Sequence, residues 1–343
     1  MNKTVMFDYF DNYGKKYPEV VVEILEYFSI QTNKPISIKD KTITNFCKQH
    51  KVKNKYIYQP QIISRICKRL CDYGMMECIR PSGILGFDSN YLFNSLKNDF
   101  FQKNREHLKF YFNSIVYGFN YIYEMYKPLV IPLVWETGNG NYAAGTGFKI
   151  YNGIVTAKHC ITDVKNLSIK GFKAEDLEDK PVYISDNEKI DIAYIETGIP
   201  TEPLLLIEEG QVMQEILVMG YPNIPTFTEF LTVEKGTISS KASTRITPTR
   251  GNIAAYGQSY IAKIEAMLIT AKIRGGNSGG PVINQNGSLV GIACQMPDYN
   301  NSEGTYDDLG YGIAVPSKYL KEIIKNKSKK IDIPSSFYRN FEE

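Results

Sequence analysis

The chain has few histidines and no segment suited to crossing a membrane. Only three of its 343 residues are histidine. No run of eighteen apolar residues occurs, which excludes a membrane-spanning helix. Residues 1–20 are polar and charged and contain no apolar run of signal-peptide length. Because 43% of the residues are hydrophobic and 22% charged, as in ordinary globular proteins, we expect a cytoplasmic protein without membrane contact.

A serine lies between glycines in the stretch Arg-Gly-Gly-Asn-Ser-Gly-Gly-Pro at residues 274–281. Small neighbours leave the hydroxyl of Ser278 accessible to a carbonyl substrate, so the pattern indicates a nucleophile. A plain glycine-rich turn is the alternative.

Two upstream residues have the chemistry that activates a serine. His159, in the segment 156–160, ends an apolar run and is the only histidine in the last two thirds of the chain, and Asp191 begins an apolar run. Imidazole is the usual base near neutral pH. Singly, these residues also fit a core histidine and the start of a strand. Their order with Ser278 is that of a Ser-His-Asp triad.

Several separated motifs carry a family resemblance. They are Gly145-Thr146-Gly147-Phe148, Val218-Met219-Gly220-Tyr221-Pro222, residues 233–239 and Tyr311-Gly312-Ile313-Ala314-Val315-Pro316-Ser317. With them, residues 129–325 resemble the trypsin-like serine proteases, and within these the HtrA/Deg branch. The resemblance implies an all-β double six-stranded barrel and a serine endopeptidase that cleaves polypeptides without a cofactor or metal.

The resemblance also implies roles for individual residues. Ser278 attacks the peptide carbonyl, His159 transfers the proton, and Asp191 orients the imidazole. The backbone N–H groups of Gly276 and Ser278 form the oxyanion hole. The residues that line the substrate pocket are Lys272, Ile273, Cys294, Gln295, Met296, Gly312 and Ala314. A medium apolar substrate residue is expected there, and an acidic one if Lys272 points inward.

The sequence departs from digestive trypsins beside the nucleophile. Asn277 replaces their aspartate, so we expect control by loop rearrangement, as in HtrA-like proteases, and not by insertion of a new N-terminus. About 25 residues follow the last strand of the resemblance, and we therefore expect no PDZ domain. Secreted trypsins pair the cysteine beside their histidine, but residues 143–150 contain no cysteine.

We therefore interpret all six cysteines as reduced thiols. A zinc site is the alternative for the four in the N-terminal third, but Cys67 and Cys71 lack a convincing second ligand pair. The six are Cys47, Cys67, Cys71, Cys78, Cys160 and Cys294.

Residues 1–95 predict a separate, mainly α domain. Apolar periodicity and capping residues predict helices over 18–30, 42–50 and 60–73 and strands over 35–38, 75–79 and 84–87. This order resembles winged helix-turn-helix domains, with residues 63–70 as the recognition helix.

The charge of the chain is uneven. Residues 1–128 carry 19 Lys and Arg against 12 Asp and Glu, whereas residues 129–343 carry 21 against 25. A group of basic residues around the second and third predicted helices is expected to contact phosphates of a nucleic acid. This group consists of Lys48, Lys51, Lys53, Arg65, Lys68 and Arg69. A regulatory protein is the alternative partner of this domain.

Residues 96–128 are rich in Phe and Tyr in a roughly helical pattern. We expect this aromatic connector to dock on the protease domain at 129–330 or on a second copy of the chain. Residues 331–343 are expected to be a tail. Two functions are weighed: a protease controlled by its winged helix, and a DNA-binding regulator with an inactive protease fold.

Overall fold

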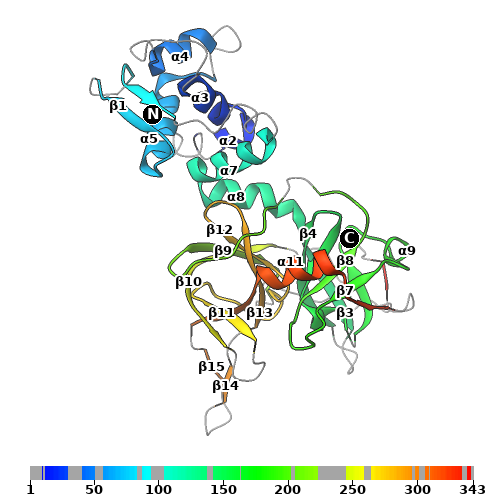
Figure 1. The fold of residues 1–343 in the computed structure, drawn as a ribbon. Helices are drawn as coiled ribbons and strands as arrows, with labels where there is room; N and C mark the ends of the chain where they lie inside the picture. Colours follow the sequence, from blue (N-terminus) through cyan, green and yellow to red (C-terminus); the bar gives the residue numbers. More distant parts are fainter. Residues whose placement is uncertain are drawn as a thin grey trace. The chain divides into compact units, whose positions relative to one another are not determined.

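The computed structural model falls into two compact units, Met1–Met125 and Tyr126–Glu343, whose strands and helices are drawn in Figure 1. We describe each unit by itself. The described residues are 10, 12–29, 41–50, 57–82, 87–93, 104–136, 142–162, 164–201, 205–222, 245–258, 264–295, 298–300, 306–308, 310–333 and 338–340.

The first unit is built from helices and one small antiparallel sheet. The helices are α2 (Tyr13–Lys16), α3 (Val20–Phe28), α4 (Ile43–His50), α5 (Pro60–Asp72), α7 (Arg105–Tyr117) and, at the unit's boundary, α8 (Phe119–Tyr126). The sheet pairs β1 (Glu77–Arg80) with β2 (Asn90–Leu92). Helices α3, α4 and α5 confirm the three helices predicted from the sequence.

Local signals explain where these helices begin and end. The Thr42 hydroxyl accepts a hydrogen bond from the N–H of Asn45 at 3.1 Å, which caps α4 as predicted. Pro60 begins α5, and Gly74 follows its end with φ +68°. The apolar face of α5 is buried through Ile62, Ile63, Ile66, Cys67 and Leu70.

The strand predictions for this unit were less accurate. The partner of β1 is Asn90–Leu92, later than the predicted strand over residues 84–87, because Phe87 and Asp88 form a turn. Residues 83–86 and the strand predicted over 35–38 lie outside the described residues.

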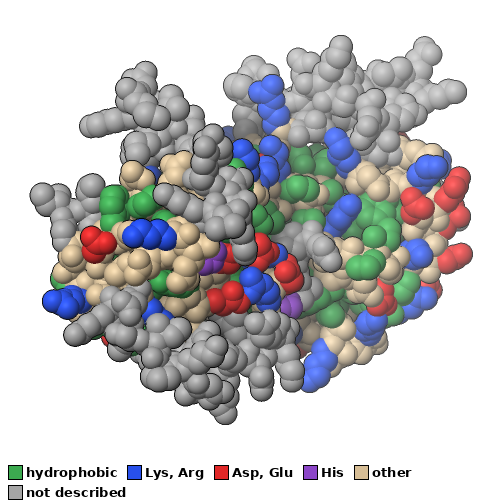
Figure 2. All heavy atoms as spheres, turned by 90° about the horizontal axis from the view of Figure 1, so that it is seen from above, with side chains coloured by type: hydrophobic (Ala, Val, Ile, Leu, Met, Phe, Trp, Pro, Cys, Tyr) green, Lys and Arg blue, Asp and Glu red, His purple; other side chains and the backbone are tan. Residues whose placement is uncertain are grey.

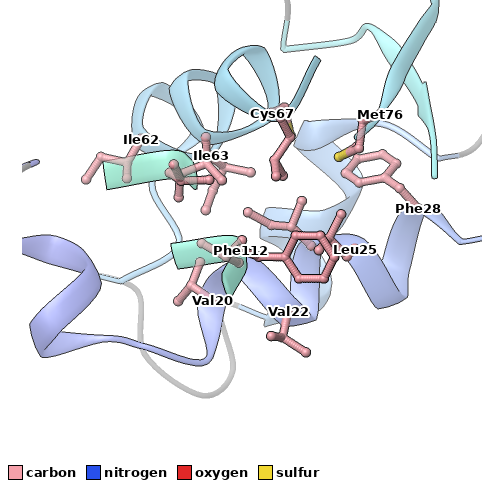
Figure 3. Close-up of a cluster of buried hydrophobic side chains, with 14 of the residues drawn as sticks. Val20, Val22, Leu25, Phe28, Ile62, Ile63, Cys67, Met76 and Phe112 are labelled. Carbon is pink, nitrogen blue, oxygen red and sulfur yellow. The ribbon is translucent and has the colours of Figure 1, made fainter. Parts of the chain in front are cut away.

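The described part of the aromatic connector belongs to the core of the first unit. Helix α7 packs against α3 and α5, and Phe112 lies among Val22, Leu25 and other buried side chains (Figure 3). Arg105 forms ion pairs with Glu19 and Glu26 of α3. The apolar face of α7 is thus covered within its own unit, while docking of the connector on the protease domain or on a second copy stays a prediction.

The second unit is mostly β and contains two large sheets and a small one, in which β14 (Asp298–Asn300) pairs with β15 (Tyr306–Asp308). The first sheet has seven strands in the order β17-β7-β8-β5-β4-β3-β6, and the second is a closed barrel in the order β10-β11-β16-β13-β12-β9. The seven strands are β3 (Val130–Glu136), β4 (Tyr142–Ile150), β5 (Gly153–Thr156), β6 (Lys165–Ile169), β7 (Val182–Ile184), β8 (Ala193–Glu196) and β17 (Lys329–Ile331). The barrel strands are β9 (Glu215–Gly220), β10 (Thr247–Gln258), β11 (Glu265–Ile269), β12 (Pro281–Asn284), β13 (Leu289–Gln295) and β16 (Gly312–Pro316).

The six-stranded closed barrel matches the expectation for one half of the domain, whereas the other half has seven strands. The extra strand comes from the end of the chain. After α11 (Ser317–Asn326), β17 pairs with β7, and Tyr338 is buried in the core of the first sheet. The described residues of the expected tail are therefore packed against the first sheet, because Ile331, Ile333 and Tyr338 supply apolar surface to its core. No helix among the described residues is long and apolar enough to span a bilayer.

Candidate active site

Strand pairing brings the predicted base and acid together. His159 lies on a short 3-10 turn (Lys158–Cys160) just after β5, and Asp191 lies just before β8. The two strands pair antiparallel with Thr156 opposite Ala193, so the residues that follow β5 and precede β8 meet at the same edge.

Both carboxylate oxygens of Asp191 bind His159. Oδ2 lies 2.6 Å from Nδ1 of the imidazole, and Oδ1 accepts the backbone N–H of His159 at 2.9 Å. This arrangement fixes the ring plane and the tautomer, with the proton on Nδ1. The other ring nitrogen, Nε2, is thereby left as the atom that can accept a proton.

The pair shifts the acidity of both groups. Burial alone would lower the pKa of His159, but the hydrogen bond and negative charge of Asp191, together with the neighbouring Cys160, raise it above its ordinary value. Burial would raise the pKa of Asp191, yet its hydrogen bonds to His159 hold it below the usual value. Asp191 is therefore ionised at neutral pH and stabilises a protonated imidazole.

Ser278 lies in the loop between β11 and β12. Its hydroxyl donates a hydrogen bond to the carbonyl oxygen of Cys294 at 2.7 Å, and no hydrogen bond to His159 is present among the described residues. A rotation about the Cα–Cβ bond of Ser278 is therefore needed before the hydroxyl proton can pass to the imidazole. Hydrogen bonds of this kind often tighten only when substrate is bound.

Two buried thiols lie against the triad backbone. Cys160 Sγ contacts the carbonyl oxygen of Ser278 at 3.8 Å, and Cys294 Sγ contacts that of Asp191 at 3.7 Å. Burial and the charge of Asp191 raise the pKa of Cys294 well above that of a free thiol. All six cysteines of the chain are free thiols.

Gly279, directly after Ser278, is needed for a steric reason that the sequence did not reveal. A Cβ on Gly279 would lie 2.1 Å from the carbonyl oxygen of Thr146, and its φ is +88°. Both conditions exclude a side chain at this position. The glycine after the nucleophile therefore allows the loop to pack directly on β4, in addition to leaving the hydroxyl accessible.

The backbone before Ser278 forms a turn with the positive φ at its third position that is typical of type II. The N–H of Asn277 donates a hydrogen bond to the Arg274 carbonyl oxygen at 2.9 Å. Gly276, at the third turn position, has a φ of +97°, whereas the φ of Gly275 is not positive. Within the described part of the chain, the N–H groups of Gly276 and Ser278 have no hydrogen-bond acceptor. These two donors are thus available to a ligand oxygen.

The predicted pocket residues fall into three groups. Ile273 is buried (3% exposed), and its side chain packs against Gly312, where a Cβ would come within 2.7 Å. Ala314 is also buried, whereas Lys272 is exposed. Met296 and the side chain of Gln295 lie outside the described residues.

Four of the six residues predicted to contact nucleic acid lie on α4 and α5. Lys48, Lys68 and Arg69 are exposed, and the guanidinium of Arg65 lies 3.9 Å above the ring of Phe10. Lys51 and Lys53 lie outside the described residues. On the face shown in Figure 2, Lys and Arg side chains of the described residues occur singly or in small groups.

Sequence reasoning missed the part that Thr146 plays. This residue of β4 is completely buried and hydrogen-bonds the nucleophile loop through both its hydroxyl and its backbone N–H. A threonine between Gly145 and Gly147 was the available signal, because a lone polar residue there needs buried partners. Across the described ranges, no group of three or more His, Cys, Asp or Glu side chains is placed to hold a metal ion.

Comparison with known proteins agrees with the geometry. Residues 145–292 match the family model of the trypsin-like peptidase domain. Curated relatives include Protease Do-like 2, chloroplastic, of Arabidopsis thaliana, which is 28% identical over 57% of this chain and 30% of its own length. A probable periplasmic serine endoprotease, DegP-like, of Rickettsia prowazekii is 30% identical over 54% of this chain and 33% of its own length.

Serine endoprotease DegS of Salmonella typhimurium is 25% identical over 50% of this chain and 45% of its own length. The chain thus spans less than half the length of these relatives.

Solved structures with a similar arrangement include a protease of M. tuberculosis in its active form, with a TM-score of 0.44 and 17% identity, over 62% of this chain and 87% of that one. An HtrA-type protease with a tripeptide gives a TM-score of 0.43 and 18% identity, over 60% of this chain and 61% of that one. Residues 145–292 form a trypsin-like peptidase domain, and the curated relatives of this part of the chain are HtrA-, DegP- and DegS-type serine proteases.

Proposed function

We propose that this protein is a serine endopeptidase that uses Ser278, His159 and Asp191. The observation that carries the proposal is the His159–Asp191 pair, with both carboxylate oxygens engaged, at a site where Cys294 contacts both Asp191 and Ser278. The unpaired N–H groups of Gly276 and Ser278 support it, because an oxyanion needs two convergent donors.

The reaction begins when Ser278 turns from the Cys294 carbonyl oxygen toward Nε2 of His159. Its oxygen forms a bond to the peptide carbonyl carbon while its proton passes to Nε2, and the carbonyl oxygen becomes an oxyanion bound by the two N–H groups. The imidazolium, stabilised by Asp191, then donates the proton to the leaving amine as the C–N bond breaks. Water, deprotonated by His159, releases the acyl group from Ser278 in the same manner.

The substrate in this proposal is a polypeptide with a medium apolar residue before the cleaved bond. Support comes from the buried side chain of Ile273 against Gly312, which gives the expected pocket an apolar wall. The exposed position of Lys272 argues against a preference for acidic residues.

For the first unit we propose a winged helix that controls or targets the protease. The order α3, α4, α5, β1, β2 supports this assignment, and Lys68 and Arg69 are exposed on α5, the expected recognition helix. Nucleic acid and a regulatory protein both remain candidate ligands. Cytoplasmic residence is part of the same proposal, although several relatives carry names that place them in the periplasm or the chloroplast.

The alternative function is a DNA-binding regulator whose protease fold is inactive. The direction of the Ser278 hydroxyl, toward Cys294 and not His159, is the observation that favours it. A fluorophosphonate probe, which forms a bond only with an activated serine, separates the two. The proposal expects covalent labelling that maps to Ser278 and is lost in Ser278→Ala. Absence of labelling, together with salt-sensitive binding of duplex DNA, would support the regulator.

A further inference from the structure

Thr146 of β4 connects the nucleophile loop to the rest of the domain. Its hydroxyl donates a hydrogen bond to the carbonyl oxygen of Gly276 at 2.6 Å and accepts one from the N–H of Tyr221 at 2.9 Å. Its backbone N–H donates to the carbonyl oxygen of Ser278 at 2.8 Å. One side chain and one amide of the same residue thus hold the carbonyl groups of both Gly276 and Ser278.

The position of Thr146 is itself firmly held. Its own carbonyl oxygen accepts the hydroxyl of Thr156 on β5 at 2.8 Å, and it lies opposite Pro132 in the pairing of β4 with β3. The side chain is fully buried, with 0% exposure. A buried hydroxyl that satisfies a carbonyl oxygen and an N–H has a single low-energy orientation, because any rotation leaves one of these groups unpaired.

The two residues held by Thr146 are those whose N–H groups have no acceptor in the part of the chain that the structure describes. Type I and type II turns differ by about a half-turn of the central peptide. In the turn over residues 274–277 that peptide carries the N–H of Gly276. With the peptide between Gly276 and Asn277 fixed against Thr146, the direction of this N–H is set by the two backbone dihedrals of Gly276, of which φ is +97°. If the loop is released, the central peptide can turn and the two donors no longer converge.

We propose that Thr146 is a positioning residue that keeps the N–H groups of Gly276 and Ser278 aligned for the oxyanion. This inference rests on the proposed peptidase function. Thr146 does not touch the substrate in this account. It acts through the backbone of the nucleophile loop, so its loss is expected to affect the transition state more than substrate binding.

The test replaces Thr146 in the full-length protein. Thr146→Val keeps the size and β-branching but removes the hydroxyl, and Thr146→Ser keeps the hydroxyl. Thr197→Val is a matched control, because Thr197 is also buried in the second unit, with 6% exposure. Its hydroxyl donates a hydrogen bond to the backbone carbonyl oxygen of Asn152 at 3.1 Å, which lies outside the nucleophile loop. Each protein is compared at equal folded concentration, determined by circular dichroism.

Hydrolysis of a fluorogenic peptide and inhibition by a peptide aldehyde of the same sequence are then measured. The aldehyde forms a tetrahedral adduct with a nucleophilic serine, and its oxygen needs the same two N–H donors. For Thr146→Val we expect kcat to fall about 10- to 100-fold with KM within about twofold, and the aldehyde to bind about 10- to 100-fold more weakly. Thr146→Ser should recover most of both losses, and Thr197→Val should show neither.

Wild-type kcat and aldehyde affinity in Thr146→Val would overturn the positioning role. So would a rise in KM with unchanged kcat, which would place Thr146 in substrate binding instead. Thr146→Cys, with a weakly hydrogen-bonding group of similar size, provides a second variant with the same expected direction. Failure of the wild-type protein to hydrolyse any peptide or to bind the aldehyde would contradict the proposed function itself, and is thereby distinguished from failure of this inference.

Discussion

The thiol of Cys294 lies 3.7 Å from the backbone carbonyl oxygen of Asp191, while the carbonyl oxygen of Cys294 accepts the hydroxyl of Ser278. One residue of β13 therefore contacts both the predicted acid and the predicted nucleophile. Because Cys294 is only 7% exposed and Cys160 is fully buried, the site contains two thiols that solvent reagents do not reach easily.

This burial predicts how the thiols react. In the folded protein at pH 8, a charged thiol reagent should modify Cys78, which is exposed, well before Cys160 and Cys294, because the reagent does not reach the two buried thiols. After unfolding without reductant, all six cysteines should titrate. Peptide mapping of the modified protein makes the measurement. Rapid native modification of Cys294, or fewer than six thiols after unfolding, would contradict the prediction.

A second prediction concerns the pH dependence of hydrolysis. His159 acts as a base only when neutral, and Asp191 raises its pKa, so kcat/KM should rise with pH as the imidazole loses its proton. Asp191→Asn removes the negative charge that raises the pKa of His159. The rising limb should therefore move to lower pH while kcat falls on the order of 10⁴-fold.

Asp186→Asn is the matched control for this experiment, since Asp186 is exposed on the same connection between β7 and β8. Its pH profile should equal that of the wild-type protein. A limb that stays in place in Asp191→Asn would show that the titration of another group controls the rate.

A third prediction follows from the surroundings of Asn277. Its side chain is 2% exposed, and Oδ1 has no hydrogen-bond partner among the described residues. A carboxylate at this position would be buried, which costs several kcal/mol unless the group is paired with a cation or becomes protonated. We expect Asn277→Asp to lower the free energy of unfolding by about 3 kcal/mol at pH 7 and by less at pH 5. Urea unfolding of both proteins at the two pH values measures this difference in the free energy of unfolding. Stability equal to that of the wild-type protein at pH 7 would point to a cation beside Asn277.

The sequence predicted the site better than the arrangement around it. His159 and Asp191 were recognisable because each has a distinctive chemistry at the end of an apolar run, and the structure brings them into contact through the pairing of β5 with β8. Thr146 was not recognised, since its role depends on contacts with Gly276 and Ser278, 130 and more residues away. The one local signal, a threonine between Gly145 and Gly147, does not state which groups the threonine binds.

Long-range packing also explains the errors in the fold. The aromatic face of α7 was correctly predicted to be buried, but the sequence does not state which surface covers it, and α3 and α5 of the same unit do so. Likewise, residues 331–343 were expected to be a tail. The residue that anchors this segment is Tyr338, whose partner strand β6 lies far away in the chain.

The most direct test of the account is hydrolysis of a fluorogenic peptide by the wild-type protein, by Ser278→Ala and His159→Ala, and by the double variant. Because the two residues act in the same steps, each single variant should lose several orders of magnitude in kcat, on the order of 10⁴-fold or more, and the double variant should lose no more than the worse of the two. Wild-type turnover by Ser278→Ala, or losses that multiply in the double variant, would contradict a reaction in which His159 activates Ser278.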